Sequence, residues 1–134
     1  MSKVLVDTSV WIDALNGNKT RQTILLDQLI DEGASVVLCP MIVQEILQGI
    51  KEDKDFREVK NNLSGFEMLS IDSLEAAYGA ASLYRNARKH GVTIRKSNDC
   101  LIAFYSIFCK VALLHNDGDF NRIAEYSPLK VLNP

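Results

Sequence analysis

The chain has 134 residues, of which 47% are hydrophobic and 24% are charged, a composition typical of one globular domain. It contains no apolar run near the roughly 20 residues that span a bilayer, and its first residues lack the apolar core of a signal peptide. We therefore expect a single cytoplasmic domain over residues 1–134 and exclude a protein that crosses a membrane through an apolar helix.

The cysteines argue against a zinc site and disulfides, whereas the net charge does not decide between classes of partner. The three cysteines, Cys39, Cys100 and Cys109, are odd in number, form no C-x-x-C pair and lie in apolar stretches. This pattern predicts free thiols and argues against a zinc site or disulfides. The formal net charge is −2. Five acids discussed below account for all of this negative excess, so net charge neither supports nor excludes a nucleic-acid partner.

The first half of the chain alternates short apolar runs with helical patterns. Residues 4–6 are apolar and mostly β-branched and predict a buried strand, after which Thr8 or Ser9 caps a short helix that ends near Leu15. The next predicted elements, in chain order, are a helix over 20–32, a strand over 35–39, a helix over 40–50 that begins at Pro40, and an amphipathic helical segment over 51–63.

The second half continues the alternation. Its predicted elements are a strand over 67–71, a helix over 72–90 that ends at Gly91, a nearly all-apolar helix capped by Ser97 or Asn98, a strand over 111–114, and an edge strand over 130–132. Alternating strands and helices predict an α/β domain, with a central, mostly parallel sheet and helices on both faces.

Acidic residues occur at the positions where such a sheet binds ligands. Asp7 and Asp117 follow strands directly or by a short turn, and ligands bind at the carboxyl ends of parallel strands. Asp99 lies in the first turn of the most apolar helix, and we expect its carboxylate at the rim of the core. Glu45 lies beside Gln44 in the helix after the second strand. Each acid alone also suits a cap, a turn or an exposed helix position, and only their joint pattern predicts a cluster.

A cluster of carboxylates repels itself and therefore implies a bound cation. Mg²⁺ and Mn²⁺ prefer oxygen ligands, and Mg²⁺ keeps several waters while using few carboxylates. The matching chemistry is hydrolysis of a phosphodiester bond, in which a metal orients the phosphate and lowers the pKa of a bound water. The residues thus predict a nuclease that depends on a divalent metal.

Four segments resemble the PIN domain, and most of all the VapC-type toxins of toxin–antitoxin pairs. They are VLVDTSVWIDAL, PMIVQEILQG, IRKSNDCLIA and LLHNDGDF, and they occur in the family's order over nearly the whole chain. The resemblance implies a Mg²⁺- or Mn²⁺-dependent endoribonuclease that leaves a 5′-phosphate and a 3′-hydroxyl. It also implies an RNA substrate, a homodimer and a small cognate antitoxin that holds the enzyme inactive.

The same resemblance assigns the residues of the site. Asp7, Glu45, Asp99 and Asp117 match the family's acidic active-site positions, and Asp119 matches a frequent additional acid. Thr8 or Ser9 matches the hydroxyl residues that follow the first aspartate. His115 departs from the family, which often has threonine there, and we expect it to support the structure of the site without acting as a base.

Basic and aromatic residues complete the set of candidates. Arg95 and Lys96, just before Asp99, and Arg122, after the HNDGDF turn, are the candidates for binding the RNA backbone. Arg85 to Lys89 either extend that surface or form a solvated helix face. Trp11 is expected in the core or a dimer contact in preference to stacking on a base.

Two other functions fit parts of the pattern. One is a PIN-fold RNA-processing nuclease that has no antitoxin. The other, from a different class, is a non-hydrolytic regulatory domain with a phosphorylatable Asp7 and bound Mg²⁺. Such domains also need a lysine at the end of a late strand, whereas Lys110 begins its strand.

Overall fold

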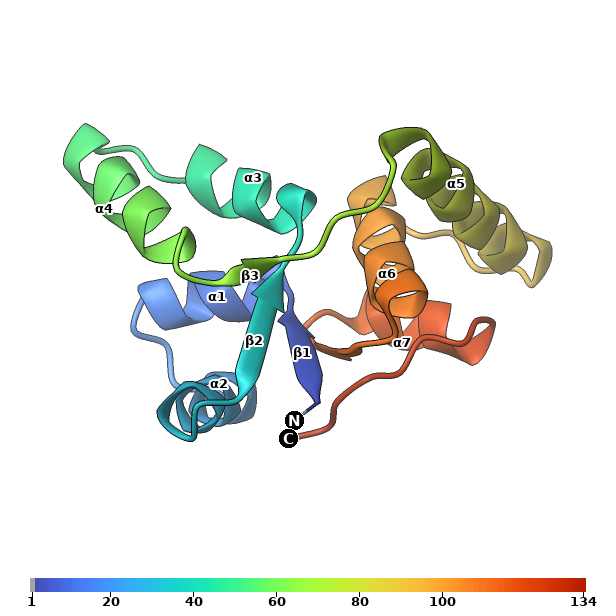
Figure 1. The fold of residues 1–134 in the computed structure, drawn as a ribbon. Coiled ribbons are helices and arrows are strands. Elements are labelled where there is room, and N and C mark those ends of the chain that lie inside the picture. Colours follow the sequence, from blue (N-terminus) through green and yellow to red (C-terminus); the bar gives the residue numbers. More distant parts are fainter. Residues whose placement is uncertain (1) are drawn as a thin grey trace.

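A computed structural model describes residues 2–134 of the chain (Figure 1). Four strands form one sheet in the order β3-β2-β1-β4, and every strand pair is parallel. The strands are β1 (Lys3–Val6), β2 (Ser35–Leu38), β3 (Glu67–Met68) and β4 (Ala112–Leu114). The helices are α1 (Thr8–Leu15), α2 (Arg21–Asp31), α3 (Pro40–Gln48), α4 (Asp53–Leu63), α5 (Ser73–Lys89), α6 (Ser97–Cys109) and α7 (Gly118–Glu125). The predicted α/β fold with a parallel sheet is confirmed.

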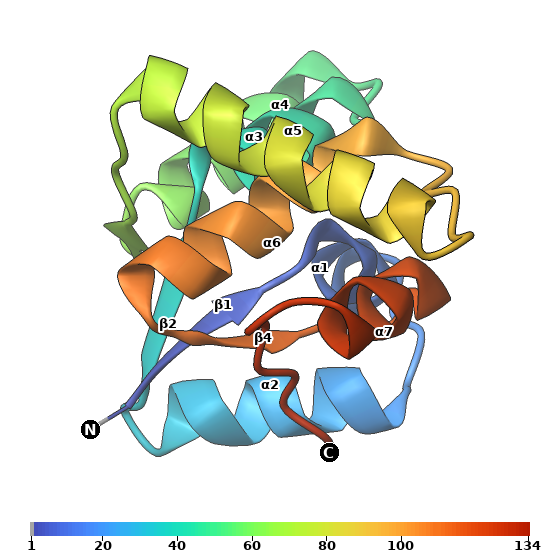
Figure 2. The same cartoon turned by 90° about the vertical axis from the view of Figure 1, so that its right-hand side faces the viewer.

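Helices cover both faces of the sheet. Figure 2 shows α2 along one face and α6 along the other, with α5 packed on the outer side of α6. The residues at the centre of the three longest strands, Leu5, Val37 and Leu113, are completely buried. Burial on both faces explains why these strands have continuous apolar sequences instead of alternating ones. No helix within residues 2–134 is long and apolar enough to span a membrane.

The structure corrects two predicted helix caps. Asp7, not Thr8 or Ser9, is the N-cap of α1, because its carboxylate accepts the backbone N–H of Ser9. Helix α6 begins after Lys96, which makes no side-chain cap bond, so neither Ser97 nor Asn98 caps it. Aspartate is as good a cap as serine, and the cap belongs to the last extended residue before the helix.

The C-terminal region differs from the prediction in two respects. The sequence pattern predicts a turn at HNDGDF and no helix, whereas α7 begins within this segment at Gly118 and is capped by the carboxylate of Asp117. The predicted edge strand over 130–132 is present only as a single parallel bridge between Val131 and Leu113. Its backbone still bonds to β4, since Leu132 N–H donates to Leu113 C=O at 2.8 Å. The C-terminal segment therefore covers the open edge of β4.

Close packing of α5 on α6 depends on Gly79. A Cβ atom built on Gly79 would lie 2.2 Å from Cε1 of Phe104. We expect Gly79→Ala to lower the free energy of unfolding by about 1–3 kcal/mol, as in other overpacked sites, although alanine itself favours helix by about 1 kcal/mol. Urea unfolding measures this, with Ser82→Ala on the same helix as control. Gly79→Ala/Phe104→Leu should recover most of the loss; an unchanged midpoint for Gly79→Ala contradicts the packing argument.

Candidate active site

Asp7 ends the central strand and begins α1. Its backbone N–H donates to Leu114 C=O at 2.9 Å, which extends the pairing of β1 with β4 to the end of both strands. Its Oδ2 accepts two hydrogen bonds from Ser9, from the backbone N–H at 3.0 Å and from the hydroxyl at 2.7 Å. Burial raises the pKa of Asp7, and the nearby charge of Glu45 adds to that effect. This carboxylate is thus held in place at a desolvated position.

The hydroxyl groups of the two residues after Asp7 connect this part of the site to neighbouring elements. The Thr8 hydroxyl donates to Oε1 of Glu45 at 2.7 Å, so α3 presents Glu45 to the end of β1. The Ser9 hydroxyl, besides donating to Asp7, accepts the backbone N–H of Asn116 at 3.0 Å. The first turn of α1 and the loop after β4 are therefore joined through one side chain.

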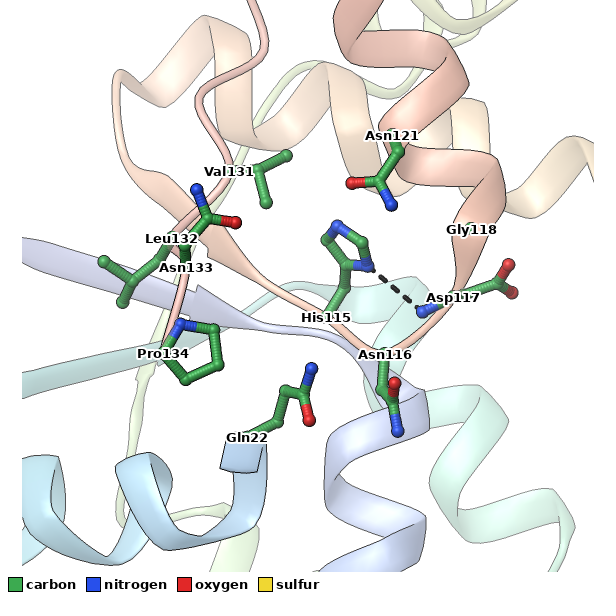
Figure 3. Close-up of a pocket in the computed structure, with 10 residues that line it drawn as sticks. All are labelled: Gln22, His115, Asn116, Asp117, Gly118, Asn121, Val131, Leu132, Asn133 and Pro134. Carbon is green, nitrogen blue, oxygen red and sulfur yellow. Dashed lines mark hydrogen bonds between the residues drawn. The ribbon is translucent and has the colours of Figure 1, made fainter. Parts of the chain in front are cut away.

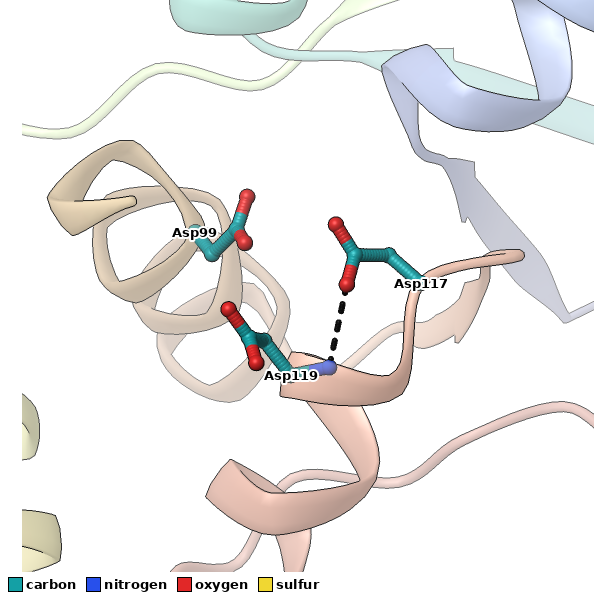
Figure 4. A group of neighbouring side chains, drawn as sticks. All are labelled: Asp99, Asp117 and Asp119. Atoms are coloured by element: carbon teal, nitrogen blue, oxygen red, sulfur yellow. Dashed lines mark hydrogen bonds between the residues drawn. The ribbon is translucent and has the colours of Figure 1, made fainter. Parts of the chain in front are cut away.

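Three more acids converge beside this pair. Asp99 lies in the first turn of α6, Asp117 caps α7, and Asp119 follows in the first turn of α7 (Figure 4). One carboxylate oxygen from each lies within 4.8 Å of the other two. The N–H of Asp119 donates to Oδ1 of Asp117 at 3.0 Å, which fixes the relative position of two of them. Asp99 is only 3% exposed, so it lies deeper than the rim position predicted from sequence.

The pKa of Asp99 is strongly raised. Burial raises its pKa first, and the charges of Asp7 and Asp117 raise it further, to about 7. Lys96 opposes this effect without cancelling it. Because Asp7 and Asp117 both act on Asp99, this residue connects the two groups of acids. Asp117 has the opposite shift: burial would raise its pKa, but the Asp119 N–H, Lys96 and Arg95 together lower it.

Basic side chains border the acids, as the sequence predicted. Arg95 Nε lies 3.5 Å from Asp119 Oδ2, and Arg122 Nη1 lies 3.5 Å from Asp119 Oδ1. Lys96 Nζ lies 3.4 Å from Asp117 Oδ2. Burial disfavours the charged form of Lys96, but the surrounding aspartates outweigh that effect and raise its pKa. All three side chains are more than half exposed, so they remain available to a ligand in solvent.

The site has room for a bound group and oxygen atoms suited to a cation. A cavity of about 250 Å³ is lined by residues from β1, α1, α3 and α6, namely Asp7, Thr8, Ser9, Ile12, Glu45, Gln48, Lys96 and Asp99. Two buried oxygens, Asp7 Oδ1 and Asp99 Oδ2, have no hydrogen-bond partner among residues 2–134, and a third, Asp119 Oδ1, has only the ion pair with Arg122. Buried polar atoms are rarely left unpaired, and unpaired carboxylate oxygens fit a hard divalent cation.

Two residues discussed at the sequence level have structural roles here. Trp11 is 8% exposed, donates its indole N–H to Val6 C=O and packs edge-on against Phe66, as expected of a core residue. His115 accepts the N–H of Asp117 on Nδ1 at 3.1 Å and thereby supports the turn that carries this acid. Sequence reasoning missed Asn116, whose backbone N–H binds Ser9; its place between His115 and Asp117 was the only available signal.

An acidic cluster at the carboxyl edge of a parallel sheet suits an α/β domain that binds a metal ion, and comparison with known families identifies the family. The PIN-domain family model matches residues 4–126, so the chain belongs to the PIN-domain family. It is 32% identical to a VapC ribonuclease of Mycobacterium bovis and, to the same degree, to ribonuclease VapC11 of Mycobacterium tuberculosis. Each match covers 95% of this chain and 96% of the relative.

Solved structures share the fold at low sequence identity. VapBC2 from Rickettsia felis, bound to a DNA fragment from its promoter, superposes with a TM-score of 0.77 and 18% identity over 98% of both chains. VapBC-1 from nontypeable Haemophilus influenzae gives a TM-score of 0.74 and 17% identity over 98% of this chain and 97% of the other. These similarities establish the fold of the chain.

Proposed function

We propose that this chain is a Mg²⁺- or Mn²⁺-dependent endoribonuclease, with residues 1–134 acting as one nuclease domain and as the toxin of a VapBC-type pair. The observation that carries this proposal is the convergence of Asp99, Asp117 and Asp119 within 4.8 Å, at the strand ends, with buried carboxylate oxygens that lack partners. Membership in the PIN-domain family and the ribonuclease activity named for the mycobacterial relatives support it.

Each acid has a distinct part in the proposed site. Asp99, Asp117, Asp119 and Asp7 hold the divalent metal, and Glu45 completes the acidic group from α3. The metal, when bound, polarises the scissile phosphate and lowers the pKa of its water. Thr8 and Ser9 hold Glu45 and Asp7 in place through the hydrogen bonds described above. A contact of either hydroxyl with substrate stays a prediction from the family resemblance.

The basic border supplies the proposed contacts with RNA. Arg95, Lys96 and Arg122 are exposed, and each lies within 4 Å of Asp117 or Asp119. With a cation bound, Asp117 and Asp119 would hold these basic side chains less tightly, because the same carboxylates would then be neutralised. The released side chains can then contact phosphates on either side of the scissile bond.

We further propose a small cognate antitoxin, a homodimer and a cytoplasmic location. The antitoxin is supported by the VapBC structures from Rickettsia felis and Haemophilus influenzae that share this fold. The cytoplasm holds the RNA substrates, and free thiols at Cys39, Cys100 and Cys109 suit a reducing compartment. Expression of the chain alone should halt growth, and coexpression of the antitoxin should restore it. A nuclease that acts in RNA processing without an antitoxin would leave growth unaffected.

The first test compares RNA cleavage by wild type, Asp7→Asn and Asp27→Asn. Asp27 is exposed on α2, away from the site, and serves as the matched control. Loss of residues that merely support metal ligands costs about 10- to 100-fold, so we expect Asp7→Asn to lower the cleavage rate by more than about 100-fold. Wild type and Asp27→Asn should cleave with Mg²⁺ or Mn²⁺ and stop when the metal is chelated. Undiminished cleavage by folded Asp7→Asn protein would refute the assignment.

A further inference from the structure

A second cavity lies behind the turn that carries Asp117. It measures about 180 Å³, and its lining comes from α2, the β4–α7 turn, α7 and the C-terminal segment. The lining residues are Gln22, His115, Asn116, Asp117, Gly118, Asn121, Val131, Leu132, Asn133 and Pro134. Figure 3 shows the carboxylate of Asp117 pointing away from this cavity, so the cavity is separate from the acidic site although both share this residue.

His115 presents an unused hydrogen-bonding group at this cavity. His115 is only 7% exposed. Its Nδ1 accepts the Asp117 N–H, so in the neutral ring the proton is on Nε2. Nε2 makes no hydrogen bond within residues 2–134 by distance and angle, although the Asn121 carboxamide lies beside the ring and is close enough to raise the pKa of His115 against the opposing effect of burial. A buried donor without a partner is costly, and a ligand that accepts from it would remove that cost.

The rest of the lining indicates the chemistry of that ligand. Gln22, Asn121 and Asn133 bring carboxamides, each of which offers a donor and an acceptor, and the surface of the cavity is mainly polar. No lysine or arginine is among the lining residues, so a phosphate is a poor occupant. Paired donors and acceptors match the edge of a nucleobase, and single-stranded RNA is recognised in part through hydrogen bonds to the edges of unstacked bases. The volume admits one small ring system, and it is below that of a drug-sized pocket.

We propose that this cavity binds an unpaired base of the RNA, next to the phosphate that is cleaved, and selects the cleavage site. The inference rests on the proposed ribonuclease function and adds a specificity site to it. His115 and Asp117 are two residues apart, so the chain between them spans at most about 7 Å. The side chains of His115 and Asp117 point to opposite sides of this turn, so the RNA strand would pass around the turn to place a base at His115 Nε2 and a nearby phosphate at the acids.

The binding test needs no catalysis. AMP, GMP, CMP, UMP and ribose 5-phosphate are titrated separately into the full chain at constant pH, while the imidazole ¹⁵N signals are followed by NMR. The chain has two histidines, and His90, on the end of α5 and stacked on Tyr126, is the internal control. We expect at least one nucleotide, but not ribose 5-phosphate, to shift the Nε2 signal of His115 and leave His90 unchanged. Gln22→Ala and Asn121→Ala should weaken that binding, and Gln28→Ala, exposed on the same helix as Gln22, should not.

The cleavage test uses a randomised single-stranded RNA with Mn²⁺. Gln22→Ala and Asn133→Ala should relax the wild-type preference for one base near the cut by about tenfold or more, the range expected for one bidentate base contact, and Gln28→Ala should keep it. The proposal is overturned if no nucleotide shifts His115, if ribose 5-phosphate shifts it equally, or if the variants keep the wild-type preference. Wild type that cuts no RNA would instead overturn the proposed function, and the NMR result would still decide whether the cavity binds a base.

Discussion

Asp99→Asn should abolish RNA cleavage and, in the absence of metal, make the protein more stable. Asp99 is the residue on which the charges of both Asp7 and Asp117 act, so its loss removes a ligand from the centre of the proposed site. We expect the cleavage rate to fall about 1000-fold or more, which corresponds to about 4 kcal/mol of lost transition-state stabilisation.

The gain in stability follows from the same electrostatics. At pH 8 the wild type must keep Asp99 ionised in a buried, acidic environment, whereas asparagine is neutral and nearly the same size. Each unit by which folding raises the pKa of a carboxyl group costs the ionised protein about 1.4 kcal/mol of stability. The pKa of Asp99 rises from 3.8 to about 7, so its replacement by asparagine can raise the free energy of unfolding by at most about 4 kcal/mol.

Two measurements on one set of proteins check this prediction. Thermal unfolding at pH 8 with a chelator should give a higher midpoint for Asp99→Asn than for wild type or Asp27→Asn. Adding Mn²⁺ should raise the midpoint of wild type and leave that of Asp99→Asn nearly unchanged, because ligands that bind only the folded state stabilise it. A less stable Asp99→Asn protein, or one that responds to Mn²⁺ like wild type, would contradict the role given to Asp99.

Metal binding and stability should also depend on pH around 7. The metal-free protein binds a proton on Asp99 with a pKa of about 7, compared with 3.8 in an unstructured chain. A carboxyl whose pKa is raised by folding stabilises the protein while it is protonated. That contribution is complete below about pH 4 and is lost as the pH rises through about 7. Protonation of Asp7 changes the stability with pH in the same direction, since burial raises its pKa as well.

Metal binding should have the opposite dependence on pH and become stronger as the pH rises, because the metal binds the ionised carboxylates. We expect the affinity for Mn²⁺ to fall by up to about tenfold per pH unit below 7 and to level off above about 8. Calorimetric titration from pH 5.5 to 8.5 measures this directly, and unfolding midpoints with a chelator give the opposite slope. An affinity that does not change between pH 6 and 8 would show that Asp99 is not among the groups that bind the metal.

The sequence alone predicted the fold, because strands buried on both faces are recognisable as apolar runs. Asp7 and Asp117 follow from the topology of a parallel sheet, since strand ends and their ligands coincide. Glu45 came mainly from the family resemblance, and the bond from Thr8 gives it a physical reason to face the site. The depth of Asp99 was underestimated, because an acid in the first turn of a helix is usually exposed.

Features that depend on three-dimensional neighbours were not predictable in the same way. Helix α7 is short and follows a sequence with several turn-forming residues, so its pattern resembles a loop. The cap of α1 was assigned to Thr8 or Ser9 because hydroxyl residues are common caps, whereas Asp7 fills that position. The cavity beside His115 is formed in part by α2 and the C-terminal segment, which are far apart in sequence.

Asp7 and Asp117 each cap a helix and also belong to the acidic site, which has a consequence for how the enzyme can be lost by mutation. Asparagine caps a helix as well as aspartate does, but it carries no charge for a metal. One base change in the codon converts aspartate to asparagine at either position. A lineage that gains by silencing this activity can therefore do so in one step and keep a folded protein.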